Sequence, residues 1–400
     1  MRIAAINGAQ GASTGQIMND LALYAWQNGH EMFTFVPATE YTVRLFPWSE
    51  TIGTAASHQE HIERGIRTGY NGIYEVEGTR EMLRLFEERG IELIHLANLH
   101  NFVLNLPLLF QWVKAHHVPV VWTLHSCWPY TGKCVHYSMA DCNRWQTGCH
   151  NCPLQHRWPY SNTDNSAAMW RLKKKWFSDV EKMVIVGTAR WITEDAKLSF
   201  LGQYPVRMIH NGIDQRYFHP VLSDFRKQNG LEGKIVLLGV ADNWLRHKGL
   251  ATMIELAGRL DTRYKLVLAG TDEQVEALLP PEILAIRNTR NKNVLAQIYS
   301  TADIFLQTTQ EETFGMVNVE ALACGTPVIT FDVGGSPDAL DESCGRVVPP
   351  GDIDAMLAAV EEQVRTHAMT PEACRKRAEY FSVERMCRDY FALYQEMLNT

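Results

Sequence analysis

Residues 310 to 327 read Gln310-Glu311-Glu312-Thr313-Phe314-Gly315-Met316-Val317-Asn318-Val319-Glu320-Ala321-Leu322-Ala323-Cys324-Gly325-Thr326-Pro327. This stretch predicts a strand, a glycine-containing turn and the start of a helix, in that order. The first amides of a helix have no internal partner, and the helix dipole is positive at that end. We therefore expect the amides of Phe314, Gly315 and Met316 to bind a diphosphate.

Two glutamates flank this turn. Glu312 precedes it, and Glu320 follows eight residues later, inside the predicted helix. From these positions one carboxylate could reach a transferred sugar and the other the hydroxyls of a ribose. The alternative is that both glutamates are solvated residues on a helix surface.

The alternation of strand, turn and helix occurs twice along the chain and predicts parallel α/β sheets. Strands are expected at 3–6, 32–36, 93–96, 118–124 and 183–186, and again at 235–240, 264–269, 303–307 and 327–331. The turn-forming segment 210–214 separates the two sets. We predict a first domain at 1–208, a second at 209–381, and a final helix at 382–400 that returns to the first domain.

The composition is that of a soluble globular protein with room for two domains. The 400 residues are 46% hydrophobic and 21% charged, and the formal net charge of −7 argues against a nucleic-acid partner. The first apolar run is too short for a signal peptide, and none approaches a membrane span. We therefore expect a cytoplasmic protein whose nine cysteines stay mostly reduced.

The spacing of Glu312 and Glu320 and the run 321–329 give the sequence its family resemblance. The chain resembles the retaining glycosyltransferases of family 4, the glycosyl transferases group 1, over nearly its whole length. That resemblance implies the GT-B fold, with two Rossmann-like domains facing across a cleft. It also implies that Glu312 lies by the hydroxyls of the donor sugar and that Glu320 holds the ribose.

Other site residues follow from the same resemblance. Gly15, in the glycine-rich segment that opens the first helix, would contact the donor; the alternative is an ordinary tight turn. Lys248 would bind the donor phosphates, unless it is a solvated surface lysine. The family's second cation follows the strand glycine directly, but here Val240 follows Gly239, so Arg246 is the substitute. His125, after the strand at 118–124, would lie close to the sugar, although a lone histidine is more often structural.

Five cysteines lie between residues 127 and 152. Cys134, Cys142, Cys149 and Cys152 make a four-thiolate set of the kind that a structural zinc ion prefers. Reduced thiols without a metal and disulfides are the alternatives. Each of these makes the insert at 127–156 a folded flap beside His125. No catalytic metal is expected, because no ligand set adjoins Glu312 and the family needs none.

The segment 170–177 mixes four cations with three aromatic residues on a predicted helix. Such a helix can dock on anionic lipid. The alternative, which the pattern favours, is a solvated basic face with the aromatic rings packed in the core.

The predicted activity is transfer of a hexose from a nucleotide-diphosphate sugar to an acceptor hydroxyl with retention at the anomeric carbon. A UDP-sugar is the favoured donor and a GDP-sugar the alternative. The expected acceptor is a lipid-linked oligosaccharide for a bacterial exopolysaccharide, capsule or O-antigen, reached by peripheral contact with the inner face of the cell membrane. The competing hypotheses are a nucleotide-sugar epimerase, a sugar-phosphate synthase, and a non-catalytic, zinc-stabilised binding module.

Overall fold

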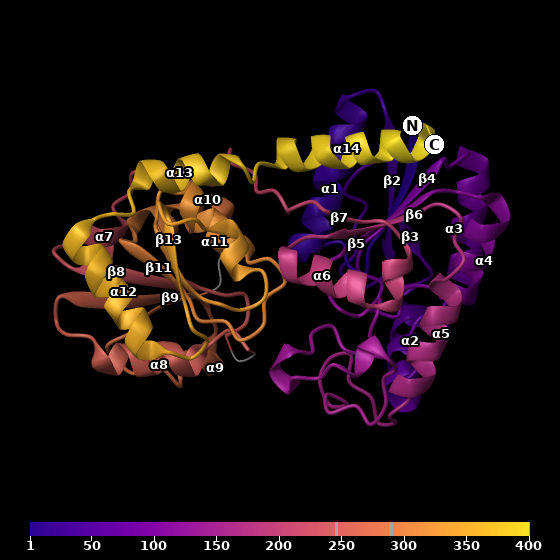
Figure 1. Cartoon of the computed structure of the whole chain (residues 1–400). Coiled ribbons are helices and arrows are strands. Elements are labelled where there is room, and N and C mark those ends of the chain that lie inside the picture. Colours follow the sequence, from indigo (N-terminus) through magenta and orange to yellow (C-terminus); the bar gives the residue numbers. More distant parts are fainter. Residues whose placement is uncertain (245–246, 288–290, 400) are drawn as a thin grey trace. The chain divides into compact units, whose positions relative to one another are not determined.

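The computed structural model describes residues 1–244, 247–287 and 291–399 and divides into two compact units. The first unit is Met1–His210 together with the segment that begins at Cys387, and the second is Asn211–Met386. Each unit has one parallel sheet with helices along it (Figure 1). The expected α/β class with two Rossmann-like sheets is confirmed.

The sheet of the first unit has seven strands in the order β3-β2-β1-β4-β5-β6-β7. Its strands are β1 (Arg2–Ile6), β2 (Glu31–Pro37), β3 (Ser49–Ile52), β4 (Leu93–Leu96), β5 (Val120–Leu124), β6 (Met183–Gly187) and β7 (Val206–Met208). Its helices are α1 (Ala12–Gln27), α2 (Ala55–Thr68), α3 (Val76–Arg89), α4 (Leu106–His116), α5 (Ser166–Phe177) and α6 (Arg190–Leu198). Every residue of β4, β5 and β6 is buried, as expected for the middle of a parallel sheet covered on both faces.

The sheet of the second unit has six strands in the order β10-β9-β8-β11-β12-β13. Its strands are β8 (Ile235–Val240), β9 (Tyr264–Thr271), β10 (Leu284–Arg287), β11 (Ile304–Gln307), β12 (Val328–Phe331) and β13 (Gly345–Val348). Its helices are α7 (Phe225–Gln228), α8 (Leu250–Arg259), α9 (Glu273–Glu276), α10 (Lys292–Thr301), α11 (Met316–Ala323), α12 (Ile353–Thr366) and α13 (Pro371–Glu379).

The strand order reverses at the first strand of each sheet. β1 lies between β2 and β4, and β8 lies between β9 and β11. In open α/β sheets, ligands bind beyond the carboxyl ends of the strands at such a reversal. The segments that follow these strands are 7–15 and 97–101 in the first unit, and 241–244, 247–249 and 308–315 in the second.

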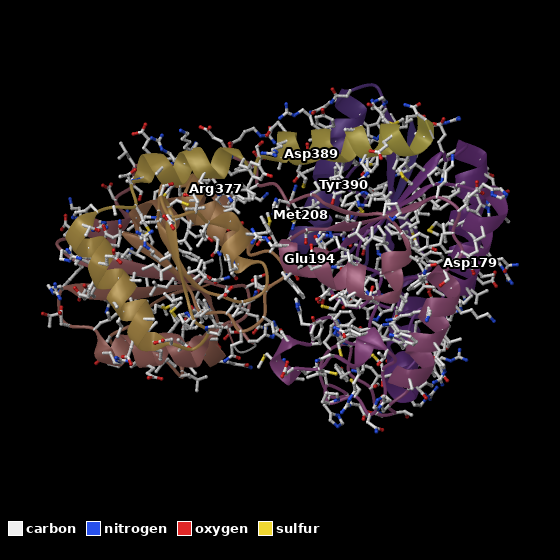
Figure 2. All side chains as sticks on the ribbon, in the orientation of Figure 1. Asp179, Glu194, Met208, Arg377, Asp389 and Tyr390 are labelled. Carbon is white, nitrogen blue, oxygen red and sulfur yellow. The ribbon has the colours of Figure 1, made fainter. Side chains whose placement is uncertain are left out.

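The last helix, α14 (Val383–Asn399), packs on the first unit through buried aromatic residues. Tyr390, labelled in Figure 2, is fully buried, and its hydroxyl lies 2.9 Å from Oγ1 of Thr123. The hydroxyl of Tyr394 lies 2.5 Å from Nδ1 of His95. Phe391 stacks on His30, with ring centroids 5.5 Å apart. These contacts explain why the chain end belongs to the first unit.

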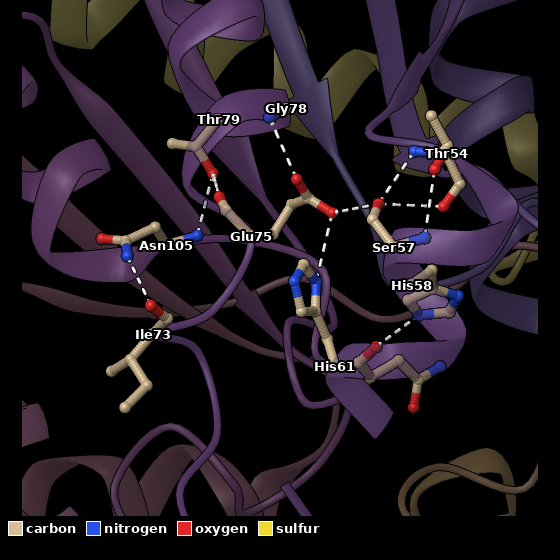
Figure 3. Close-up of polar contacts among 10 residues, drawn as sticks. Thr54, Ser57, His58, His61, Ile73, Glu75, Gly78, Thr79 and Asn105 are labelled. Atoms are coloured by element: carbon tan, nitrogen blue, oxygen red, sulfur yellow. Dashed lines mark hydrogen bonds and ion pairs between the residues drawn. The ribbon is translucent and has the colours of Figure 1, made fainter. Parts of the chain in front are cut away.

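A buried carboxylate joins α2 to α3 (Figure 3). Glu75 accepts hydrogen bonds from Oγ of Ser57 at 2.8 Å and from the amide of Gly78 at 3.0 Å. Nδ1 of His61 lies 3.2 Å from Oε2 of the same carboxylate. Glu75 therefore caps α3 while it holds two residues of α2.

Across the described ranges, the helices are all too short or too polar to cross a bilayer.

Candidate active site

The turn between β11 and α11 has the conformation that its glycine permits. Gly315 has φ +85° and ψ 58°, in the left-handed region that other residues rarely adopt. It is the N-cap of α11 and provides no side-chain cap. Its carbonyl accepts a hydrogen bond from the amide of Asn318 at 3.0 Å, and the positive end of the helix dipole lies at this turn. Phe314 is buried, with its ring 5.7 Å from that of Phe381, and Met316 is half-buried at the start of the helix.

Lys248 and Glu312 meet at the carboxyl ends of β8 and β11. Nζ of Lys248 lies 2.9 Å from Oε2 of Glu312, and both side chains keep some exposure, 25% and 15% respectively. Burial acts to lower the pKa of Lys248, but the charge and hydrogen bond of Glu312 outweigh it, so that pKa is raised. Lys248 is therefore an ammonium ion paired with a carboxylate beyond the carboxyl ends of two central strands.

A second pair lies beside the first. Nδ1 of His247 is 3.6 Å from Oε2 of Glu311, which is buried. The carbonyl of His247 also accepts a hydrogen bond from the amide of Gln310 at 2.8 Å. The sequence gives no signal for this pair, because its two halves are far apart along the chain. The main-chain contact fixes how the segments carrying Lys248 and Glu312 approach each other.

Glu320 lies on α11 and is half-buried. Burial raises its pKa to about 7, although the hydroxyl of Tyr299 and the charge of Lys292 act in the opposite direction. The Tyr299 hydroxyl donates to Oε2 of Glu320 at 2.9 Å. Near neutral pH this carboxyl is therefore divided between its ionised and protonated forms.

Gly15 and His125 belong to the first unit. Gly15 is the fourth residue of α1, and a Cβ atom placed there would lie 2.1 Å from the carbonyl oxygen of Gln10. The turn before the helix therefore packs directly on it. Asn7 holds that turn, with Nδ2 donating to the carbonyl of Ala9 at 2.7 Å and Oδ1 accepting from the amide of Asn98 at 3.1 Å. Sequence reasoning did not single out Asn7.

His125 follows β5 and is buried. Burial lowers its pKa to about 4, so its imidazole is neutral at physiological pH. The residue lines a small cavity together with Thr14, Met18, His95 and Tyr390. The structure thus places His125 and the first turn of α1, next to Gly15, around one cavity. Arg246 lies outside the described residues.

The predicted four-thiolate zinc site is not supported. In residues 1–244, 247–287 and 291–399, no group of three or more His, Cys, Asp or Glu side chains is placed to hold a metal. Sγ of Cys134 lies 3.8 Å from Sγ of Cys152, but Sγ of Cys149 accepts a hydrogen bond from the amide of Gly132 at 3.1 Å. Cys142 lines a separate surface hollow. The spacing supplies the right ligand type, but in the described residues the four thiols do not form a metal-binding group.

Two buried lysines hold the cysteine-rich insert instead. Nζ of Lys133 donates to the carbonyls of Gln155 and Arg157, both at 2.9 Å. Nζ of Lys173 donates to the carbonyl of Trp128 at 2.7 Å and lies 3.5 Å from the centroid of its indole ring. Burial lowers the pKa of both lysines. Their amino groups cross-link loop carbonyls, a structural use that sequence reasoning missed.

The basic and aromatic segment 170–177 lies on α5, with Trp170, Lys173 and Phe177 buried. The indole nitrogen of Trp170 donates to the carbonyl of Trp145 at 2.8 Å. Lys174 and Lys175 are exposed. This arrangement is the solvated basic face with two of its aromatic rings in the core, and it leaves those two rings unavailable to a lipid surface.

Comparison with known protein families shows to which family the chain belongs. Residues 15–217 match the family Glycosyltransferase Family 4, and residues 223–380 match the family described as Glycosyl transferases group 1. The chain belongs to glycosyltransferase family 4. This family 4 glycosyltransferase is therefore a transferase enzyme, and the resemblance inferred from Glu312, Glu320 and the run after them is confirmed.

Relatives of this glycosyltransferase extend along most of its length. It is 24% identical over 320 residues to a protein of Escherichia coli named as the colanic acid biosynthesis glycosyl transferase WcaC, covering 77% of each chain. Sucrose-phosphate synthase from Thermosynechococcus elongatus superimposes with a TM-score of 0.72 at 19% identity, covering 100% of this chain and 99% of that one. HepE from Anabaena in complex with UDP-glucose gives a TM-score of 0.68 at 14% identity, covering 99% and 100%. These structural likenesses establish the GT-B fold.

Proposed function

We propose that this glycosyltransferase moves a hexose from a nucleotide-diphosphate sugar, with a UDP-sugar favoured over a GDP-sugar, to an acceptor hydroxyl with retention at the anomeric carbon. In this proposal Asn211–Met386 is the donor-binding domain and the first unit the acceptor-side domain. The proposed acceptor is a lipid-linked oligosaccharide of bacterial polysaccharide biosynthesis, met in the cytoplasm at the inner face of the cell membrane.

The observation that carries this proposal is the ion pair of Lys248 and Glu312 beside the start of α11. An ammonium group and a helix N-terminus without a side-chain cap provide positive potential for a diphosphate. A carboxylate next to them can accept hydrogen bonds from sugar hydroxyls. Glu320, farther along α11, is in turn the proposed acceptor for the ribose hydroxyls.

Donor binding changes the partner of Lys248 in this scheme. Before binding, Glu312 neutralises the ammonium group and fixes its position. A phosphate oxygen then competes for the ammonium group, and the Glu312 carboxylate becomes available to the hydroxyls of the hexose. The aliphatic chain of Lys248 is flexible enough to move its ammonium group from the Glu312 carboxylate to a phosphate oxygen.

The chemical step forms a bond between the acceptor oxygen and the anomeric carbon while the bond from that carbon to the phosphate oxygen breaks. Negative charge grows on the released diphosphate, which also takes the proton of the acceptor hydroxyl. Lys248 and the amides of Phe314, Gly315 and Met316 would stabilise this charge without reorganising. We assign Gly15 a donor contact and His125 a hydrogen bond to the sugar, made by a neutral imidazole.

Two comparisons support the choice of substrates. HepE was solved with UDP-glucose, which favours a UDP-hexose as donor for a chain of the same fold. The relative WcaC is named for colanic acid biosynthesis, a polysaccharide pathway, and this favours a growing saccharide as acceptor. The lipid carrier and the membrane contact are our extension of that choice.

A thermal-shift panel of UDP-, GDP- and ADP-hexoses tests the donor, because a ligand that binds only the native state raises its stability. We expect the UDP-hexose to stabilise the wild type and to lose this effect in Glu320→Ala. We also expect UDP to be released only when acceptor is present, and NMR of the product to show the donor's anomeric configuration. Inversion at the anomeric carbon would refute the proposed stereochemistry. Isomerisation of the donor without acceptor would instead indicate an epimerase.

A further inference from the structure

Tyr299 is a rigid part of the second unit. It lies on α10 and is fully buried, with its ring centroid 5.6 Å from that of Phe305 and 6.2 Å from that of Phe218. Its carbonyl accepts a hydrogen bond from Oγ1 of Thr326 at 2.7 Å. Packing on two aromatic rings and this backbone contact leave the side chain little freedom.

The Tyr299 hydroxyl points to one carboxylate oxygen. It donates to Oε2 of Glu320 at 2.9 Å. Burial, followed by the charge of Glu320, raises the pKa of Tyr299 well above its usual value. The phenol therefore keeps its proton, and it can act toward the carboxylate only as a hydrogen-bond donor.

We propose that Tyr299 is the positioning residue for Glu320: its hydroxyl occupies Oε2 and directs Oε1 toward the ribose hydroxyls of the donor. The inference rests on the proposed donor-binding role of Glu320 and adds the residue that prepares it. A carboxylate with one oxygen anchored loses less rotational freedom on binding than one that is free. The same hydrogen bond favours the ionised form, which is the form that accepts from ribose.

The surroundings of Glu320 limit which other groups affect its charge. On α10, Lys292 acts on it in addition to Tyr299, and Cys324 lies at the end of α11 itself. On α13, which also packs against α11, Arg377 pairs with Asp341. The strands β11 and β12 carry no titratable side chain, and the short helix η4 (Ser336–Ala339) contributes Asp338. Tyr299 is the group that hydrogen-bonds to the Glu320 carboxylate in the described structure.

The test compares Tyr299→Phe with Tyr264→Phe. Tyr264, on β9, also donates to a glutamate, with its hydroxyl 2.7 Å from Oε1 of Glu361 on α12, but that glutamate has no proposed role in binding. UDP-glucose affinity is measured by calorimetry from about pH 6 to about pH 9, and kcat at saturating donor is measured alongside. A Glu320→Gln variant reports whether Glu320 contributes to binding at all.

We expect Tyr299→Phe to weaken UDP-glucose binding by about 10- to 100-fold near neutral pH. Affinity should rise with pH as Glu320 ionises. In Tyr299→Phe the midpoint of that rise should move to higher pH, because the hydrogen bond from Tyr299 that lowers the pKa of Glu320 is gone. The value of kcat should change much less, and Tyr264→Phe should behave as wild type in every measurement.

The outcomes separate the two proposals. If Glu320→Gln weakens binding but Tyr299→Phe leaves the pH midpoint unchanged, the positioning role is wrong, and any loss of affinity reflects packing alone. If Glu320→Gln itself binds UDP-glucose as tightly as the wild type, the proposed function fails at its ribose site, independently of Tyr299.

Discussion

Lys248 and Glu312 are 64 residues apart in the sequence, yet Nζ of the one lies 2.9 Å from Oε2 of the other. Their meeting follows from strand order, because β8 and β11 are neighbours in the sheet and both residues come after the carboxyl ends of these strands. The ion pair is therefore a product of the sheet topology, and the local sequence around either residue does not predict it.

Lys248→Ala should lower kcat/KM by about 10²- to 10³-fold, because it removes a preorganised cation from the leaving diphosphate. The matched control is Lys234→Ala, whose ammonium group donates to the carbonyl of Thr262 and has no role in the proposed site. Initial rates of UDP release with acceptor present measure the effect. Equal rates for the two variants would exclude Lys248 from the chemistry.

Glu320→Gln should stabilise the ligand-free protein at alkaline pH. Because burial raises the pKa of Glu320 from 4.5 to about 7, the folded state binds a proton more tightly than the unfolded chain does. The protonated Glu320 carboxyl therefore contributes to stability in full below the pKa of the unfolded chain. This stability is lost as the pH rises through the pKa of the folded state. At about pH 8 the variant should gain roughly 1–3 kcal/mol in unfolding free energy, and at about pH 4 almost nothing. Denaturant titrations at the two pH values measure this difference, and a pH-independent gain would contradict the assigned charge state.

His125 should contribute to acid destabilisation of the first unit. Its pKa is lowered by burial from 6.5 to about 4, so its stabilising contribution is present above the unfolded pKa and is lost as the pH falls through the folded value. Between about pH 6.5 and pH 4, the unfolding free energy of His125→Asn should fall less steeply with decreasing pH than that of the wild type. The two slopes should differ by up to about 1.4 kcal/mol per pH unit. His116→Gln, at the exposed end of α4, serves as the control. Identical slopes for wild type and His125→Asn would show that the imidazole is not held neutral.

Gly15→Ala should destabilise the first unit whether or not donor is present. The added Cβ would lie 2.1 Å from the Gln10 carbonyl oxygen, so the turn before α1 must move. Gly258→Ala is the contrasting change, because nothing lies within 4 Å of its Cβ position on α8. Thermal unfolding without ligand should show a loss of stability for Gly15→Ala. For Gly258→Ala it should show a gain in stability of about 0.5–1 kcal/mol. A Gly15→Ala protein as stable as wild type would show that the turn before α1 can move away from the added Cβ without loss of stability.

Glu75→Gln should cost about 1–3 kcal/mol of stability, because hydrogen bonds that a carboxylate accepts from Ser57 and Gly78 become weaker or are lost. Glu77→Gln, two residues along the chain and 82% exposed, should change stability by less than about 0.5 kcal/mol. Urea unfolding monitored by tryptophan fluorescence distinguishes the two. Similar midpoints would mean that the Glu75 network does not hold α2 against α3.

The sequence pattern predicts the central strands and misses the edges. The predicted strands correspond to β1, β2, β4, β5 and β6 in one sheet and to β8, β9, β11 and β12 in the other. The four strands that it misses, β3, β7, β10 and β13, are the two edges of each sheet. An edge strand buries fewer side chains, as the exposed residues of β7 and the half-buried residues of β10 show, so it lacks a continuous apolar run.

The site divides in a similar way. The spacing of the two glutamates together with the run after Glu320 predicts Glu312, Glu320 and the glycine turn, because these features lie within one strand, turn and helix. The partners that set their charge and orientation, Lys248 for one glutamate and Tyr299 for the other, come from separate elements. The zinc prediction is unsupported for a related reason: ligand spacing reports residue type, whereas tertiary structure decides where the sulfur atoms lie, and the described residues hold no metal-binding group.

Local order along the chain determined the two α/β sheets, the turn at Gly315 and the family, because helix and strand periods and glycine conformations are properties of short segments. Tertiary structure alone decided that Glu312 faces an ammonium group, that burial brings the Glu320 pKa to about 7, and that Lys133 and Lys173 hold the cysteine-rich insert. These properties depend on burial and on distances between segments that only the packed sheets bring together.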